Sequence, residues 1–221
     1  MSENDTHAAD QVSAVKHASP MLRSAKVVCQ SGEYICLVRD VSDEGVLLSF
    51  LHDVPSEPRI ILALGNGRTY PIQRIWSGKE QAGYRFAGAV TLAEFLHESA
   101  PFNLRPVRLS VRATARIIDG AQSHVARLLD ISTHGAKIEC NAPMAQGRLI
   151  SCQMHGVAQQ LSQVVWCEAT ETGAVCGLQF QHPLTLRELA RSALRMQPDG
   201  PQGLSGPERT FSQPLAKATA A

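Results

Sequence analysis

The chain repeats a turn motif at a fixed spacing of 90 residues, and this repeat constrains its fold more than any other feature of the sequence. Residues 38–50 read VRDVSDEGVLLSF, and residues 128–140 read LLDISTHGAKIEC. In each segment an apolar run ends in an aspartate, a short polar turn follows, and a second apolar run leaves the turn. The identical positions are Asp40 and Asp130, Ser42 and Ser132, Gly45 and Gly135, and, further along, Trp76 and Trp166. The repeat predicts a duplicated domain.

Short β-rich runs separated by turn residues surround both copies of the motif. About six such runs fall in each copy, and this regular spacing is typical of a small antiparallel barrel or sandwich. Each copy closes with a segment of helical apolar spacing that starts at a threonine and has a glutamate three residues later, the pattern of a capping box. The expected strands are residues 25–29, 34–40, 46–50, 59–65, 70–76 and 83–90, then 114–119, 123–130, 135–140, 147–154, 161–166 and 174–180; the helices are 91–100 and 185–196.

The domain organisation follows from the repeat and from the composition of the two ends. We expect an N-terminal tail over residues 1–20, a first domain over 21–100, a second domain over 101–197 and a C-terminal tail rich in Pro, Gly and Ser over 198–221. The second copy is four residues longer between its tryptophan and its helix, and we expect this insertion in a hairpin loop.

Composition excludes several classes of function. A formal net charge of +1 and an aromatic content of 5% argue against nucleic-acid binding and against attraction to an anionic membrane. No apolar run approaches the ~20 residues of a membrane span, and the N-terminus lacks the apolar segment of a secretory signal, so we expect a cytoplasmic protein. In that compartment the six cysteines would stay reduced; they form no C-x-x-C pair, and we expect neither a metal site nor a cofactor.

The sequence also gives no sign of catalysis. Ser132 and His134 share a turn, but residues two apart need not face each other, and the chain has no G-x-S-x-G elbow. We therefore expect that the protein is not an enzyme and that His134 is exposed and incidental.

Both copies carry two further motifs behind the turn. Each has an apolar residue followed by tryptophan, and then Gly-x-x-Phe: Ile75-Trp76 with Gly83-Tyr-Arg-Phe86, and Val165-Trp166 with Gly177-Leu-Gln-Phe180. Together with two D-x-S-x-x-G turns in register, these motifs make residues 24 to 197 resemble a tandem PilZ-domain protein. Each tryptophan ends an apolar run, and we expect both in the core.

The resemblance implies a fold and a function. The family is bacterial and folds as a six-stranded antiparallel β-barrel with a C-terminal helix, so the expected fold class is mostly β, with two such barrels. It is known for binding the second messenger cyclic di-GMP. The chain would thus be a receptor or effector that regulates motility, biofilm or exopolysaccharide output through a downstream protein partner. The oligomeric state is left open.

The resemblance also implies a site in the second copy. The family's R-x-x-x-R motif corresponds to the arginine-rich stretch over residues 103–117, which precedes the turn. Arginine suits such a ligand, because guanidinium groups match phosphate oxygens bidentately and stack on purines. A literal R-x-x-x-R spans Arg108 to Arg112, whereas aligning the strands places Arg108 at the second arginine and Leu104 at the first. We expect ligand to order residues 100–112. The expected ligand-binding residues are Arg105, Arg108, Arg112, Asp130, Ser132 and Gly135.

Two alternatives remain beside this interpretation. Arg112 and Arg116 alternate with apolar residues and could line a solvated strand face. Either aspartate could simply cap its turn, and we favour that role for Asp40, since the first copy offers only Lys16, His17 and Arg23 upstream. The first copy is expected to keep the fold without the ligand site. The alternative function is a protein-interaction adaptor in which both barrels are degenerate and no nucleotide binds.

Overall fold

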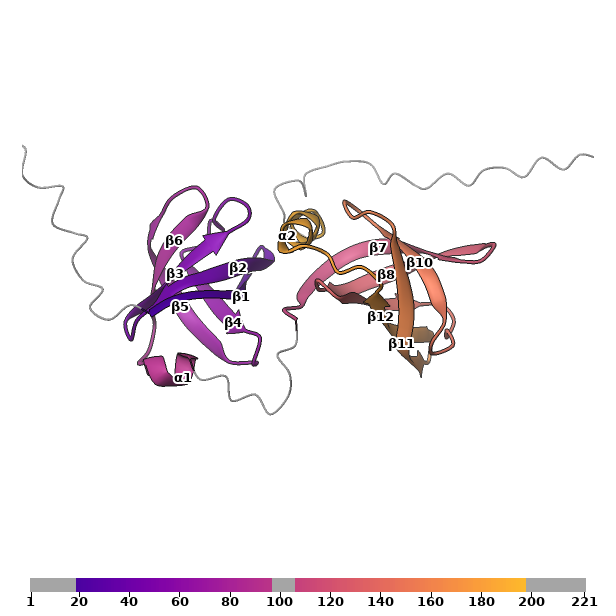
Figure 1. Ribbon diagram of the computed structural model, residues 1–221, viewed down its shortest axis with the longest axis horizontal. Coiled ribbons are helices and arrows are strands. Elements are labelled where there is room, and N and C mark those ends of the chain that lie inside the picture. The colour runs from indigo at the N-terminus through magenta and orange to yellow at the C-terminus, as the bar shows by residue number, and fades with distance from the viewer. Residues whose placement is uncertain (1–18, 97–105, 198–221) are drawn as a thin grey trace, which may run out of the picture.

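The described part of the chain contains two closed six-stranded barrels of identical strand order (Figure 1). The computed structural model describes residues 19–96 and 106–197. The first barrel has the order β1-β2-β3-β6-β5-β4 and the second β7-β8-β9-β12-β11-β10. Every pair of neighbouring strands is antiparallel, including the pairs β1–β4 and β7–β10 that close the two barrels. The predicted fold class and the predicted duplication are confirmed.

Most strands coincide with the segments expected from the sequence or extend them, but the expected strand 83–90 ends at Phe86 and the expected strand 147–154 begins at Leu149. The first barrel consists of β1 (Ser19–Cys29), β2 (Gly32–Val41), β3 (Gly45–Phe50), β4 (Arg59–Leu64), β5 (Thr69–Ser77) and β6 (Gln81–Phe86). The second consists of β7 (Leu109–Asp119), β8 (Gln122–Ile131), β9 (Gly135–Cys140), β10 (Leu149–Met154), β11 (Gln160–Thr170) and β12 (Gly173–Phe180). Alternate residues of each strand point into a barrel, so Ile138 and Cys140 of β9 are buried in the second core while Lys137 and Glu139 are less so.

A helix follows each barrel. The first helix, α1 (Leu92–Leu96), is short, and its Phe95 is fully buried against the rings of Tyr70 and Phe86. The second, α2 (Leu186–Arg195), has the predicted capping box between Thr185 and Glu188. Neither described helix has the length and apolarity that a membrane crossing requires.

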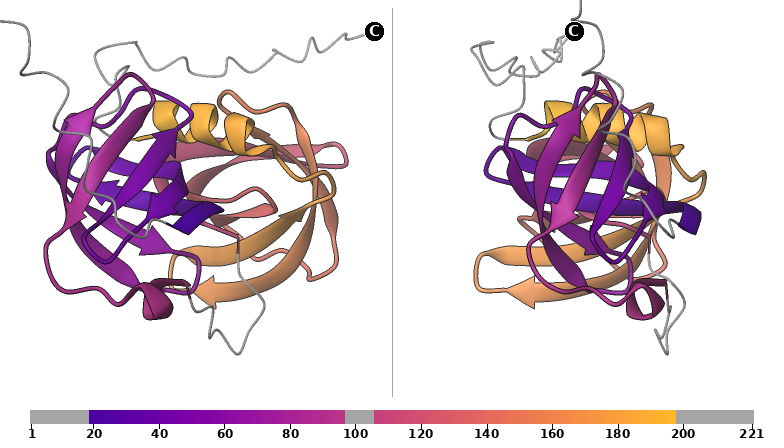
Figure 2. Two further views of the ribbon diagram at one scale, coloured as in Figure 1. Left: turned by 60° about the vertical axis from the view of Figure 1, so that its left-hand side comes forward. Right: turned by 90° about the vertical axis from the view of Figure 1, so that its left-hand side faces the viewer.

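The barrels touch through both apolar and polar groups. Ile35 of β2 is 1% exposed and belongs to the hydrophobic cluster of the second barrel, while Leu194 of α2 packs against the cluster of the first. Figure 1 shows α2 between the two barrels, and Figure 2 shows the same helix along the second barrel beside the first.

Hydrogen bonds also join the two barrels. The Glu33 carboxylate accepts hydrogen bonds from the Lys26 ammonium and the Ser110 N–H, each at 2.7 Å. The Gln197 amide donates to the carbonyl oxygens of Glu33 and Ser110.

The four additional residues of the second copy lengthen a β-ladder. In the first barrel the β5–β6 ladder ends at the pair Ser77 and Ala82. In the second barrel the corresponding ladder continues to the pair Thr170 and Gly173. The prediction of a longer loop was therefore wrong, because the second ladder gains three residue pairs and only two residues remain between its last paired positions.

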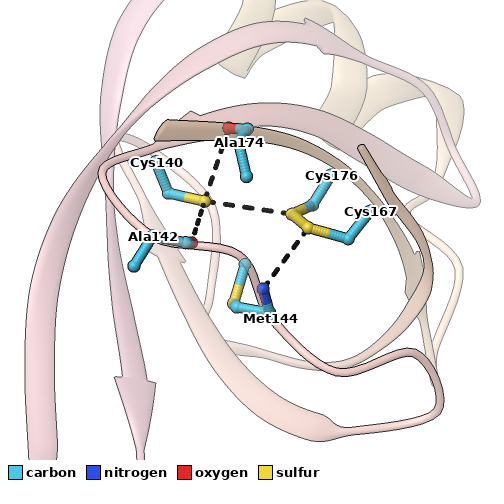
Figure 3. Close-up of a disulfide and its surroundings, with 6 residues drawn as sticks. All are labelled: Cys140, Ala142, Met144, Cys167, Ala174 and Cys176. Atoms are coloured by element: carbon cyan, nitrogen blue, oxygen red, sulfur yellow. Dashed lines mark hydrogen bonds between the residues drawn. A yellow bond between two sulfur atoms is a disulfide. The ribbon is translucent and has the colours of Figure 1, made fainter. Parts of the chain in front are cut away.

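The six cysteines comprise three buried thiols, the partly buried thiol of Cys29 and one disulfide. Cys36, Cys140 and Cys152 are buried, as expected for cysteines that act as small hydrophobes, and burial raises the pKa of the Cys152 thiol to about 12. Cys167 and Cys176 are joined by a disulfide (Figure 3), so the prediction that all six are reduced is wrong. These two residues are direct neighbours in the β11–β12 register, which places both side chains on one face of the ladder.

Candidate functional site

The turn between β8 and β9 is held closed by the hydroxyl group of Ser132. The backbone N–H of Ser132 donates to the carbonyl oxygen of Gly135 at 2.8 Å. The hydroxyl oxygen of Ser132 accepts from the backbone N–H of His134 at 3.3 Å. Ser132 is 1% exposed, whereas His134 is exposed as expected. The described contacts of Ser132 thus shape the turn. The same arrangement recurs in the first barrel, where Ser42 bonds Gly45.

The glycine that ends this turn is needed for close packing of the backbone. A Cβ atom on Gly135 would overlap the carbonyl oxygen of Leu178 on the neighbouring strand β12. In the first barrel a Cβ atom on Gly45 would likewise overlap the carbonyl oxygen of Tyr84. Gly135 is not among the glycines with positive φ, so this position requires glycine for the close approach of the neighbouring strand and not for a left-handed turn.

An ion pair joins the arginine segment to the acidic residue of the turn. Nη1 of Arg108 lies 2.8 Å from Oδ1 of Asp130, and the two side chains are 51% and 21% exposed. Among the described residues the Asp130 carboxylate makes no other hydrogen bond, and Oδ2 is left without a protein partner. Arg105 lies outside the described residues. In the first barrel Asp40 instead accepts a hydrogen bond from the backbone N–H of Val41 at 2.9 Å.

Arg112 lies apart from this ion pair. A bulge interrupts the β7–β8 register between Ser110 and Ala113, and the N–H of Arg112 donates to the carbonyl oxygen of Met196. The exposed side chain of Arg112 lines a cavity of about 880 Å³ between the barrels, to which the first barrel contributes Glu33. Ser110 also lines the cavity and pairs in register with Asp130, so the cavity adjoins the ion pair.

The two tryptophans lie on the outside of the barrels, contrary to the prediction that they belong to the core. Trp76 is 50% exposed and Trp166 is half-buried. A Cβ atom on Gly83 or Gly177 would overlap the indole of Trp76 or Trp166, respectively, so each glycine makes room for an indole that lies flat on the barrel wall. A bulge just before each tryptophan shifts the alternation of the strand and turns the side chain outward.

Lys137, which the sequence did not suggest as a site residue, lies beside the ion pair. Lys137 of β9 is opposite Asp130 on one side and opposite Gly177 on the other. Its Nζ atom lies 5.9 Å from the centroid of the Trp166 ring, within range of a cation–π contact. Arg108, Asp130, Lys137 and Trp166 therefore form one continuous row across the outer face of the second barrel, which we call the polar row.

The described part of the chain contains no group of three or more His, Cys, Asp or Glu side chains placed to hold a metal ion. The chemistry that the polar row offers is recognition of an anion. Guanidinium and ammonium groups donate to phosphate oxygens, the second oxygen of Asp130 can accept from N–H donors, and the half-buried indole of Trp166 offers an aromatic face.

Comparison with known proteins identifies the second barrel. The family model described as PilZ domain matches residues 104–196. No curated protein matches the chain in sequence.

The chain is also similar to several solved structures. They include PlzA of Borreliella burgdorferi in complex with c-di-GMP (12% identity, 78% of this chain and 87% of that chain, TM-score 0.33). YcgR of Escherichia coli in complex with c-di-GMP is similar at 13% identity, over 76% of this chain and 80% of that chain, with a TM-score of 0.32. The inhibitor of motility MotI/DgrA of Bacillus subtilis is similar at 8% identity, over 80% and 97%, with a TM-score of 0.37. The family match, and not these structures, identifies residues 104–196 as a PilZ domain, and a barrel of the same strand order precedes it.

Proposed function

We propose that the protein is a non-catalytic cytoplasmic receptor for cyclic di-GMP, and that the second barrel binds the ligand. The observation that carries the proposal is the ion pair between Arg108 and Asp130, which sets a guanidinium and a carboxylate side by side on the outer face of the PilZ domain. Cyclic di-GMP is a dianion with two guanine bases, and it needs donors for its phosphates and both donors and acceptors for its bases.

Each group of the proposed site matches a group of that ligand. The guanidinium of Arg108 would bond a phosphate or the O6 and N7 atoms of guanine, which is a common target of arginine. The free oxygen of Asp130 would accept from the N1 and N2 donors of guanine. Arg112 and Arg105 would extend the contact along the arginine segment, and Arg112 faces a cavity of about 880 Å³. Ser132 and Gly135 would hold the turn in place.

The first barrel lacks this combination. Its Asp40 accepts a hydrogen bond from the backbone N–H of Val41, and the position 90 residues before Arg108 is Ala18. In place of a ligand site, the first barrel offers Glu33 and Ile35 as contacts to the second. We infer that it serves as a packing partner of the PilZ domain and that a downstream protein reads the ligand-bound form to control motility, biofilm or exopolysaccharide output.

Calorimetric titration of the intact protein with cyclic di-GMP tests the proposal. We expect saturable binding that is lost in Asp130→Ala, because the guanine donors lose their acceptor and Arg108 loses the group that orients it. The matched control is Asp40→Ala, which changes the same residue in the repeated turn and should bind like the original protein. An absence of heat and of any thermal shift at high micromolar ligand would instead support the adaptor that binds no nucleotide.

A further inference from the structure

We propose that Lys137 is a phosphate-binding residue of the second barrel, held in position by the face of Trp166. The proposal rests on the proposed function, since it takes cyclic di-GMP as the ligand, and it adds a residue that lies outside both the arginine segment and the D-x-S-x-x-G turn. Three features of the polar row support it: register, charge and the difference between the two barrels.

The register places Lys137 on the same face as the ion pair. Directly opposite residues of an antiparallel ladder project to the same side, with Cα atoms about 4.5–5.5 Å apart. Asp130 is opposite Lys137, and the neighbours Ala136 and Ile138 are buried in the core, so Lys137 points out of the barrel. The lysine stem then lets its ammonium reach a ligand that rests on Asp130.

The charge balance gives Lys137 a role that Arg108 does not fill. Arg108 and Asp130 neutralise each other at 2.8 Å, so the pair alone attracts a dianion weakly. Among the described residues the Lys137 ammonium has no hydrogen-bond acceptor and no carboxylate within ion-pair distance, and its described contact is the indole of Trp166. An indole face attracts the ammonium without satisfying its three N–H donors, which remain available to phosphate oxygens.

The first barrel shows what the row looks like without this residue. It keeps the aspartate, the glycine and the tryptophan at Asp40, Gly83 and Trp76, but the position opposite Asp40 is Leu47. The lysine is thus not required for the barrel or for the packing of tryptophan on glycine, because the first barrel builds both with a leucine. What the second barrel gains from Lys137 is a positive charge beside its acidic turn.

The test measures cyclic di-GMP binding to the intact chain by calorimetry in four forms: unchanged, Lys137→Leu, Lys137→Arg and Lys79→Leu. Lys137→Leu installs the residue of the first barrel, and we expect about 10- to 100-fold weaker binding, the usual effect of one hydrogen bond to a charged group. Lys137→Arg retains the charge and N–H donors for a phosphate, and should bind within about threefold of the unchanged protein. Lys79 is an exposed lysine on the β5–β6 hairpin of the first barrel, and Lys79→Leu should leave binding unchanged.

Three outcomes would overturn the proposal. Binding of Lys137→Leu equal to or tighter than that of the unchanged protein would show that the ammonium only covers the indole. Equal weakening by Lys137→Leu and Lys79→Leu would show a general effect of charge. Thermal unfolding without ligand measures the stability of each variant. If Lys137→Leu is unfolded at the temperature of the titration, its loss of binding would show a structural role for Lys137. Failure of the unchanged protein to bind overturns the proposed function itself, and so is distinct from a failure confined to the Lys137 variants.

Discussion

Replacing Arg108 with alanine is expected to reduce the affinity for cyclic di-GMP at least about 100-fold, which in a calorimetric titration amounts to loss of binding. The substitution removes a forked donor that can hold a phosphate or a guanine edge by two hydrogen bonds, each worth about 1.5–3 kcal/mol when a charge is involved. It also leaves the Asp130 carboxylate without its described partner, so that an unpaired negative charge faces a dianionic ligand.

The same substitution should leave the fold intact. Arg108 and Asp130 are both partly exposed, and exposed ion pairs contribute little to stability. Arg23→Ala, in the first barrel, serves as the control and should not change binding. Arg108→Lys should bind more weakly than the unchanged protein, because an ammonium lacks the planar fork. Normal binding by both Arg108→Ala and Arg23→Ala would show that the site has been assigned to the wrong residues.

Replacing Gly135 with alanine is expected to lower the free energy of unfolding by at least about 3 kcal/mol, near the upper end of what a single substitution in a core does. The added methyl group would overlap the carbonyl oxygen of Leu178, a backbone atom in the β9–β12 ladder that cannot rotate away. Relief requires separation of the strands at the pair Gly135 and Gln179, next to the turn that carries the proposed site.

Urea denaturation of the intact chain measures this effect. The control is Gly88→Ala, where a Cβ atom would meet no atom within 4 Å and φ is not in the left-handed region. Gly45→Ala should behave like Gly135→Ala, because a Cβ atom at that position would overlap the carbonyl oxygen of Tyr84. A Gly135→Ala protein as stable as the Gly88→Ala protein would mean that the barrel can open at this ladder without cost.

Much of the fold could be predicted because the repeat provides two readings of one pattern. An alternating run such as residues 135–140 predicts a strand with an inner and an outer face, and β9 has these bounds. The capping box at Thr185 is a local signal that depends on four consecutive residues, and it is present in the structure. The acidic turn was also predictable, because Ser132 and Gly135 act within a few residues of each other.

The features that could not be predicted depend on register between strands distant in sequence. The outward position of Trp166 follows from a bulge after Val164, which breaks the alternation that the sequence displays. The Cys167–Cys176 disulfide requires the residue pairing of a hairpin whose extra residues were expected in a loop. The place of Ile35 in the core of the other barrel requires the arrangement of the two barrels.

Two of these features left a signal in the sequence. Glycine inside a strand often marks a close approach by another group, and Gly83 and Gly177 occur at matching places in the two copies, each after a tryptophan. When the two copies are aligned at the spacing of 90 residues, Lys137 also corresponds to Leu47, just after the repeated turn. That difference between the copies indicates a role specific to the second barrel, although only the strand register connects Lys137 with Asp130.

The central claim is that only one of two barrels with the same fold binds the ligand, and the most direct test is to map binding on both in one sample. Two-dimensional ¹H–¹⁵N spectra of the intact protein, recorded during a titration with cyclic di-GMP, report each backbone amide separately. We expect saturable shifts for the amides of residues 130–137, including Gly135, while residues 40–47, including Gly45, stay in place. Shifts at residues 40–47, or unchanged spectra at saturating ligand, would contradict the claim.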